Sequence, residues 1–134
     1  MTAFLGKWKF ESSLFMAKFL AEFGYEDSAI AEALGNKPSG DFQKHGDRWR
    51  FIYTVDGQSY TKECELGVPF SETSTDGRKV KCCWRLENDE LVNDEEDIDT
   101  GRILHERISM VDGKMVYKAT VNGVTGTRIF ARTE

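Results

Sequence analysis

The residue of this sequence whose chemistry most needs a partner is Arg128, which lies in the C-terminal stretch Val124–Phe130. On a β-strand, alternation places Arg128 on the same face as Gly126 and Phe130 and opposite to Ile129. If this face points inward, the guanidinium keeps its charge and requires an anion, either a protein carboxylate or the head group of a bound molecule. If Ile129 points inward instead, Arg128 is an ordinary solvent-exposed residue. The stretch alone supports both orientations equally.

A second group of residues with possible chemistry is the acidic run Asn93–Asp99. It lacks the spacing and the central glycine of a calcium-binding loop, so a solvated strand is the favoured interpretation and no metal site is predicted. Alternation nevertheless places Asn93, Glu95 and Asp97 on one face. If that face points inward, Glu95 could pair with Arg128.

An enzymatic arrangement can also be written for this chain. Arg128, Glu106 and Tyr117 could in principle polarise a bound carbonyl and move a proton, as an isomerase does. However, the serines and the two histidines form no recognised nucleophile and base motif. The sequence therefore predicts a protein that is not an enzyme and that carries no cofactor.

Composition restricts the class of protein further. The 134 residues suffice for one domain over residues 1–134, but not for two. A net charge of −5 without a basic run argues against nucleic acid as a partner. No signal-type segment and no run of about 20 apolar residues is present, so we expect a cytoplasmic protein. Cys64 and the vicinal pair Cys82-Cys83 lack metal-ligand spacing with either histidine and are expected to be reduced thiols.

The elements that must position Arg128 can be predicted from periodicity. Residues Gly6–Glu11 alternate strictly, as in a half-buried strand. Apolar residues at helical spacing predict an amphipathic helix over Ser13–Phe23. A second, short helix is expected to be capped by Asp27 or Ser28 and to end before Pro38. Packing against a core explains these apolar stripes better than a membrane-binding hairpin does.

After Pro38 the pattern changes to short strands separated by turn sequences such as Asp56-Gly57, Asp112-Gly113 and Asn122-Gly123. This regular spacing predicts a mainly all-β fold of ten antiparallel strands in up-and-down order. Closure into a barrel would remove the exposed sheet edges. The helix pair, at about residues 13–36, would form a helix-turn-helix lid.

A ten-stranded barrel is too wide for its own side chains to fill, so it should hold water or a ligand. An apolar molecule with one charged end would fit a cavity in which Arg128 lies beside the following residues: Trp49, Phe51, Tyr53, Tyr60, Cys64, Tyr117 and Phe130. The alternative is an interaction or storage protein whose interior is filled by Tyr53, Tyr60 and Tyr117.

Several blocks of this sequence resemble those of the intracellular lipid-binding protein family, the calycin-type barrels that include fatty-acid-binding proteins and their retinoid-binding relatives. The blocks span nearly the whole chain: Phe4–Lys9, Lys37-Pro38, Gly46-Asp47, Leu66–Thr73, Asp76–Lys81, Asp112–Lys114 and Thr127–Phe130. The resemblance implies a ten-stranded barrel with a helical lid. It also implies reversible, non-covalent binding of a long-chain fatty acid or similar lipid for transport through the cytosol.

The resemblance further implies roles for individual residues. In many members an inward Arg-x-Tyr near the C-terminus holds the ligand carboxylate, and Arg128 matches its arginine. The expected lining residues are Tyr117 and Phe130. The expected helical roof consists of Met16, Phe19 and Ala33, and the expected portal consists of Gly57, Thr75 and Asp76.

Three departures from the family pattern bear on this site. Phe130 replaces the tyrosine of Arg-x-Tyr, which removes a hydroxyl donor worth about 0.5–1.5 kcal/mol. In the family a second arginine usually helps to hold the carboxylate, and its position falls on Glu106 when counted from the N-terminal blocks and on Ile108 when counted from the C-terminal ones. Arg107, between them, points inward only if a β-bulge reverses the alternation. Gly57 replaces the portal phenylalanine and leaves a smaller gate.

We therefore expect a monomeric cytosolic carrier of one hydrophobic ligand, with a fatty acid anchored by Arg128 as the first choice. If Glu106 or Glu95 pairs with Arg128 instead, a neutral lipid or a retinoid is favoured. The acidic residues of the lid outnumber its lysines: Glu22, Glu26, Asp27 and Glu32 against Lys18 and Lys37. At most transient contact with anionic membranes is therefore expected, and transfer of the lipid should be diffusional.

Overall fold

The computed structural model describes residues 3–74 and 76–133. The helices are α1 (Met16–Phe23) and α2 (Asp27–Gly35). The strands are β1 (Gly6–Leu14), β2 (Ser39–His45), β3 (Arg48–Val55), β4 (Gln58–Glu65), β5 (Phe70–Thr73), β6 (Lys79–Cys82), β7 (Arg85–Glu87), β8 (Glu90–Asp97), β9 (Ile103–Val111), β10 (Lys114–Val121) and β11 (Val124–Arg132).

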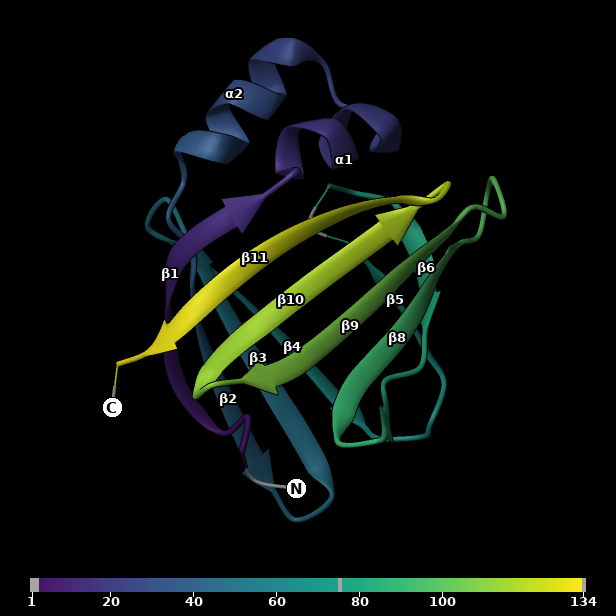
Figure 1. The fold of residues 1–134 in the computed structure, drawn as a ribbon. Helices are drawn as coiled ribbons and strands as arrows, with labels where there is room; N and C mark the ends of the chain where they lie inside the picture. Colours follow the sequence, from purple (N-terminus) through teal and green to yellow (C-terminus); the bar gives the residue numbers. More distant parts are fainter. Residues whose placement is uncertain (1–2, 75, 134) are drawn as a thin grey trace.

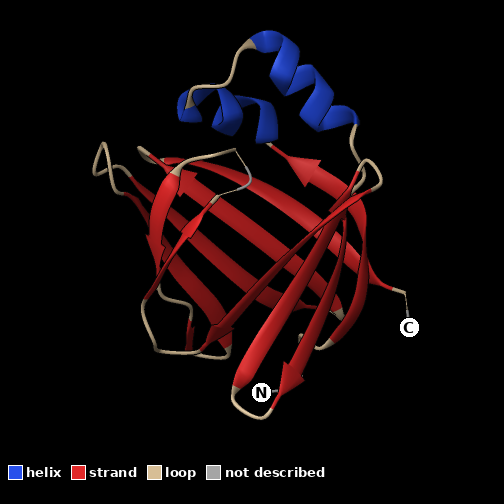
Figure 2. Cartoon of the chain, turned by 180° about the vertical axis from the view of Figure 1, so that it is seen from behind, coloured by secondary structure: helices blue, strands red, loops and turns tan. Residues whose placement is uncertain are grey.

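Ten of these strands form one antiparallel path, in the order β4-β3-β2-β1-β11-β10-β9-β8-β6-β5. The path curls into a barrel, and both helices lie over one of its ends (Figures 1 and 2). The three-residue strand β7 pairs with β8 outside this path. The predicted mainly β, up-and-down barrel with a helical lid is therefore confirmed.

The barrel is not fully closed. The strands β4 and β5 form the two ends of the path and are not paired with each other within the described residues. Side chains bridge this opening where backbone hydrogen bonds do not. Lys62 on β4 donates from Nζ to Oε1 of Glu72 on β5 at 2.9 Å.

Tight turns hold the last three strands in register. Asp112 and Gly113 have φ angles of 52° and 79°, and Asn122 and Gly123 have φ angles of 49° and 78°. Positive φ at both central residues is typical of type I′ turns, whose twist suits paired antiparallel strands. The resulting register places Tyr117 on β10 directly opposite Arg128 on β11.

The first helix begins later than its apolar periodicity predicts, at Met16 rather than at Ser13. Residues Ser12–Leu14 instead continue β1 and pair with β11 after a register shift near Phe10. Phe15 then turns the chain with φ 58°, a left-handed conformation that costs a non-glycine residue about 1–2 kcal/mol. The lid is therefore slightly shorter than predicted.

Two clusters of buried apolar residues lie above and below the interior. The first, which we call the lower cluster, includes residues near the N-terminus, and Figure 1 shows the N-terminus at the end of the barrel opposite the helices. Its buried members include Phe4, Trp8, Trp49, Leu91, Ile108, Met115 and Phe130. The second, which we call the upper cluster, joins the helices to the strands below them. Its buried members are Met16, Phe19, Leu20, Phe23, Ile30, Leu104, Ala119 and Val121.

The helix α1 can lie close to β11 because Gly126 has no side chain. A Cβ atom at this position would lie 2.5 Å from Met16 Sδ and 2.9 Å from Phe19 Cβ. Both distances are shorter than ordinary carbon contacts of about 3.5–4.0 Å. Gly126 therefore sets the height of the lid above the barrel.

Candidate ligand-binding cavity

A cavity of about 350 Å³ lies between the two apolar clusters. This volume is in the range of sites that bind small molecules. Apolar side chains from the lid and from the barrel floor line it, including Met16, Phe19, Phe51, Ile108, Met115 and Phe130. Tyr53, Tyr60 and Tyr117 line this space as well, which contradicts the alternative of an interior that they fill.

Arg128 extends from β11 into the cavity, on the same face of the strand as the buried Phe130. Its Nη1 donates to Tyr53 Oη at 3.4 Å, which is long for a hydrogen bond. Within the described part of the chain, no carboxylate oxygen lies within 4.0 Å of the Arg128 guanidinium. Because a guanidinium stays charged in proteins, the cavity contains a cation without an anionic partner among these residues.

Glu106 also faces the cavity, where it accepts two hydrogen bonds. Tyr117 Oη donates to Glu106 Oε2 at 2.5 Å, and Asn93 Nδ2 donates to Glu106 Oε1 at 3.0 Å. Burial raises the pKa of Glu106, and the hydrogen bonds oppose this effect only in part. Burial also raises the pKa of Tyr117, with Glu106 as the second cause.

Arg107, a candidate ligand-binding residue if a β-bulge turned it inward, lies on the outer face of the barrel, so this candidate role is wrong. β9 pairs with both neighbours without a register shift, so no β-bulge reverses its alternation. Arg107 Nη1 donates to Glu90 Oε1 at 2.5 Å, and the Arg107 side chain is 53% exposed. The two candidate positions for the family's second arginine carry the inward Glu106 and the buried Ile108.

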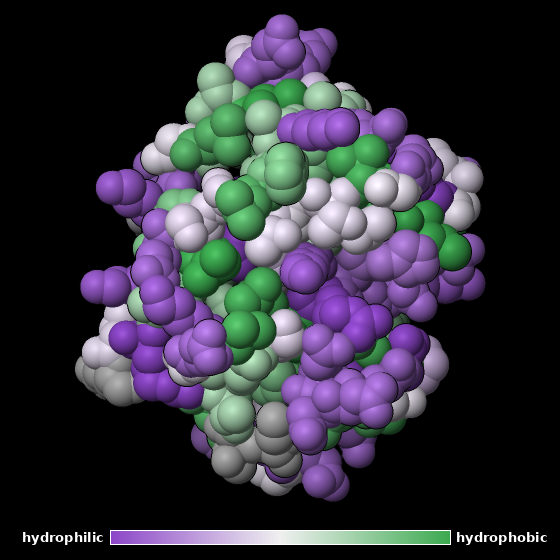
Figure 3. Space-filling model, in the orientation of Figure 1, coloured by the Kyte–Doolittle hydropathy of each residue, from purple (hydrophilic) through white to green (hydrophobic). Residues whose placement is uncertain are grey.

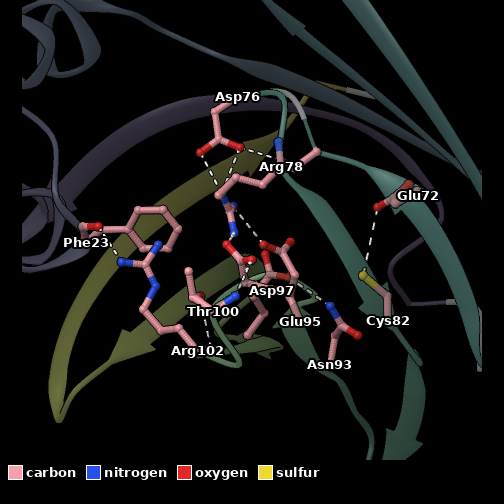
Figure 4. A network of polar contacts seen from close by, with 12 residues as sticks. Phe23, Glu72, Asp76, Arg78, Cys82, Asn93, Glu95, Asp97, Thr100 and Arg102 are labelled. Carbon is pink, nitrogen blue, oxygen red and sulfur yellow. Dashed lines mark hydrogen bonds and ion pairs between the residues drawn. The ribbon is translucent and has the colours of Figure 1, made fainter.

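A second arginine, Arg78, lines the cavity from the β5–β6 turn, and its role was not predicted from the sequence. Arg78 donates from Nη2 to Glu95 Oε1 at 2.9 Å and from Nε to Asp76 Oδ2 at 2.8 Å. Asp97 Oδ2 lies 3.8 Å from Arg78 Nη1 (Figure 4). The interpretation of the acidic run as a solvated strand is thus wrong for one face. Glu95 does point inward, but its partner is Arg78 rather than Arg128.

The same network holds the end of α1. The Phe23 ring stacks on Tyr25 with ring centres 5.6 Å apart. The guanidinium carbons of Arg78 and Arg102 lie 4.8 and 4.1 Å from the Phe23 ring centre (Figure 4). Tyr25 Oη donates to Asp76 Oδ2 at 3.1 Å. We refer to Phe23, Tyr25, Asp76, Arg78 and Arg102 as the lid clasp.

Lys62 is a further cavity residue that the sequence interpretation missed. It lines the cavity between Tyr60 and Cys64 in the alternation of β4. Those two neighbours were expected to face inward, so the same alternation could have identified Lys62. Burial alone would lower the pKa of Lys62, but its hydrogen bond to Glu72 makes the net shift a rise.

The remaining predicted site residues are distributed unevenly. Met16, Phe19 and Asp76 line the cavity, whereas Ala33 packs against the upper cluster without lining it. Gly57 lies in the β3–β4 turn with φ 76° and is not a lining residue. Thr75 lies outside the described residues.

No group of three or more His, Cys, Asp or Glu residues in the described chain could hold a metal ion. No helix in the described ranges is long and apolar enough to cross a membrane.

A nearly closed ten-stranded barrel with a helical lid, an apolar cavity and an inward arginine defines a class of lipid-carrying β-barrels. Sequence comparison gives the family. Residues 2–133 match the model of the lipocalin / cytosolic fatty-acid binding protein family, and the chain belongs to this family. The predicted resemblance is therefore confirmed. Because the family consists of carriers rather than enzymes, the isomerase alternative is not supported.

Individual relatives match the chain over almost its full length. Fatty acid-binding protein 9 of Mus musculus is 32% identical over 129 residues, which cover 96% of each chain. The intestinal fatty acid-binding protein of Bos taurus is 30% identical and covers 97% of this chain and 98% of its own. Among solved structures, the REP1-NXSQ fatty acid transporter matches with a TM-score of 0.89 at 25% identity, over 100% of this chain and 98% of that one.

Proposed function

We propose that this protein is a cytosolic carrier that binds one long-chain fatty acid reversibly in its internal cavity. Arg128 holds the ligand carboxylate, and the apolar lining holds the acyl chain. In this proposal residues 1–134 act as one lipid-binding domain, in a monomer that needs no cofactor or metal.

The observation that carries the proposal is the environment of Arg128. Within the part of the chain that the structure describes, its side chain makes a single polar contact, the 3.4 Å hydrogen bond to Tyr53. A fatty acid would supply both the missing anion and an apolar body for the cavity. The relatives named as fatty acid-binding proteins support this ligand class.

The proposal is tested by titrating delipidated protein with a fluorescent long-chain fatty acid and, in parallel, with the corresponding fatty alcohol. Arg128→Ala should weaken binding of the acid at least tenfold, about 1.4 kcal/mol, while sparing the alcohol. Arg107→Ala removes the same charge from the outer face and serves as the matched control. Equal losses for the acid and the alcohol would show that Arg128 is structural, and absence of saturable binding by the wild type would reject the carrier.

A carrier of a neutral lipid or a retinoid remains the second candidate, and it requires an internal partner for Arg128. Both candidate carboxylates have other partners: Glu95 accepts from Arg78, and Glu106 accepts from Tyr117 and Asn93. Native mass spectrometry of co-purified lipid separates the two candidates. A retinoid or a neutral lipid in the spectrum would favour the second.

We further propose that the lipid is transferred through water, with at most transient membrane contact. The lid end exposes apolar side chains, among them Phe15 at 73% and Leu34 at 44%, and Figure 3 shows hydrophobic surface over the helices. The excess of acidic residues on the lid opposes its attraction to anionic bilayers. Transfer rates should therefore be independent of vesicle concentration, and a steep rise with anionic vesicles would overturn this.

A further inference from the structure

Four inward side chains on neighbouring strands form a polar row across the barrel wall: Asn93 on β8, Glu106 on β9, Tyr117 on β10 and Arg128 on β11. Asn93 lies opposite Glu106, and Tyr117 lies opposite Arg128. Hydrogen bonds of 3.0 Å from Asn93 and 2.5 Å from Tyr117 meet on Glu106. Because directly opposite residues have Cβ atoms about 4.5–5.5 Å apart, Tyr117 is within reach of a group bound to Arg128.

The surroundings of Glu106, rather than its hydrogen bonds, favour its uncharged form. Both donors, the Asn93 amide and the Tyr117 hydroxyl, are neutral groups. A buried carboxylate that has no cation beside it is costly and tends to take up a proton. In agreement with this geometry, burial raises the pKa of Glu106.

The charged groups that face Glu106 from other elements do not change this conclusion. The other charged side chains that line the cavity are Lys62, Glu72, Asp76, Arg78, Glu95 and Arg128. The Lys62 ammonium is held by Glu72 at 2.9 Å. Glu95 adds negative charge, which also raises the pKa of Glu106. In the described ranges, no oxygen of the Glu106 carboxylate lies within 4.0 Å of a nitrogen of the Arg128 guanidinium.

We infer that Tyr117 is the second donor of the head-group site, and that an uncharged Glu106 frees the Tyr117 hydroxyl hydrogen for a ligand carboxylate on Arg128. Protonated Glu106 donates from Oε2 to Tyr117 Oη, while its Oε1 continues to accept from Asn93. Tyr117 then donates to the ligand and replaces the hydroxyl that Phe130 lacks. An ionised Glu106 instead accepts the hydrogen bond from the Tyr117 hydroxyl, and its negative charge repels the ligand carboxylate.

This inference rests on the proposed function and gives it a dependence on pH. The ligand class is the ionised long-chain carboxylic acid, and its affinity should fall as Glu106 loses its proton. A fatty alcohol has no charge to be repelled, so its affinity should change little over the same range. The selectivity for acid over alcohol should therefore fall as the pH rises through the titration of Glu106.

The first test is Tyr117→Phe, measured with the same fluorescent fatty acid and fatty alcohol at pH 6. Loss of one hydrogen bond to a charged group should weaken binding of the acid about tenfold and leave the alcohol within about twofold. Thermal melting and circular dichroism verify that the variant is folded. An equal loss for both ligands, or no loss for the acid, would overturn the role of Tyr117.

The second test is Glu106→Gln, which remains informative if Tyr117→Phe fails to fold. The glutamine amide can donate to Tyr117 Oη and accept from Asn93, so it imitates the protonated acid at every pH. The variant should lose the pH dependence and bind the fatty acid several-fold more tightly than wild type at the alkaline end of the titration. The matched control is His105→Gln, which removes the exposed neighbouring titratable group on the outer face of β9 and should keep the wild-type pH dependence.

The outcomes separate this inference from the proposed function. If Arg128→Ala weakens fatty-acid binding but wild type and Glu106→Gln show the same pH profile, only the inference fails. If wild type binds no fatty acid, or if Arg128→Ala leaves acid binding unchanged, the proposed head-group site fails with it. If His105→Gln abolishes the pH dependence, the dependence does not come from Glu106 and the inference is overturned.

Discussion

Replacement of Gly126 by alanine tests whether helix α1 of the lid packs directly against β11. The new Cβ would lie 2.9 Å from Phe19 Cβ and 2.5 Å from Met16 Sδ. The Met16 sulfur can move with its flexible side chain, but Phe19 Cβ is fixed to the backbone of α1. To restore an ordinary contact of about 3.5–4.0 Å, α1 must retreat by roughly 0.6–1 Å.

Two effects of opposite sign determine the change in the free energy of unfolding. Overpacking of this kind costs about 1–3 kcal/mol. Replacing glycine in a strand also restricts the unfolded chain, which stabilises the fold by about 0.4–1 kcal/mol. We therefore expect a net destabilisation of about 1–2 kcal/mol in urea unfolding. Because the lid moves away from the cavity, fatty acid should also dissociate faster in stopped-flow measurements.

The control for this experiment is Gly40→Ala on β2. A Cβ there would lie 3.7 Å from Phe42 Cε1 and 3.9 Å from the Ile52 carbonyl oxygen, which are ordinary contacts. This variant should be neutral or more stable than wild type, and the difference between the two variants isolates the overpacking cost. If both variants change the free energy of unfolding by the same amount, the close packing of α1 against Gly126 is refuted.

Two further predictions concern titratable side chains. Burial, followed by Asp76, raises the pKa of Tyr25 from 10.0 to about 12, so the stability from this residue is complete below pH 10 and is lost as pH rises towards 12. Urea unfolding at pH 9 and 11 should show a smaller alkaline loss in Tyr25→Phe; an identical loss would mean that the lid clasp does not hold Tyr25 in the folded state. Burial raises the pKa of Cys64 to about 11 and that of Cys82 to about 12, so both thiols should react with a disulfide reagent at pH 8 far more slowly than the partly exposed Cys83. Rapid labelling of all three thiols would contradict this.

The barrel was predictable because its signals are local. Turn pairs such as Asn122-Gly123 mark the hairpins, and alternation in the intervening segments gives the strands. The start of α1 was not predictable from the same patterns. The apolar spacing extends back to Leu14, but pairing of this residue with Thr127 on β11 keeps it in the strand. That competition is between distant segments, and local periodicity does not report it.

The cavity residues also divide into those that local patterns predict and those that depend on contacts between distant segments. Alternation around Arg128 left two orientations open; the family resemblance favoured the inward one, and the folded barrel, in which Arg128 lies opposite Tyr117 and lines the cavity, assigns its face. Glu106 and Arg107 were ambiguous because the count from each end of the family pattern differs by two residues, whereas an unbroken register on β9 separates inside from outside. Arg78 gave no local signal, since its partner Glu95 lies 17 residues away and meets it only in the folded barrel.

The sign of the charge inside the cavity depends on Glu106. Seven lining side chains are acids or strong bases: Lys62, Arg78 and Arg128 against Glu72, Asp76, Glu95 and Glu106. With Glu106 ionised, four acids face three bases, and a carboxylate ligand would enter a negatively charged interior. Two like charges 4 Å apart repel by about 4 kcal/mol near a protein surface, enough to cancel most of what Arg128 offers. With Glu106 protonated, the lining charges balance and Arg128 is the base without a close acid. On this inference a neutral Glu106 favours binding of a fatty acid, whereas an ionised Glu106 shifts the preference of the same cavity towards neutral lipids.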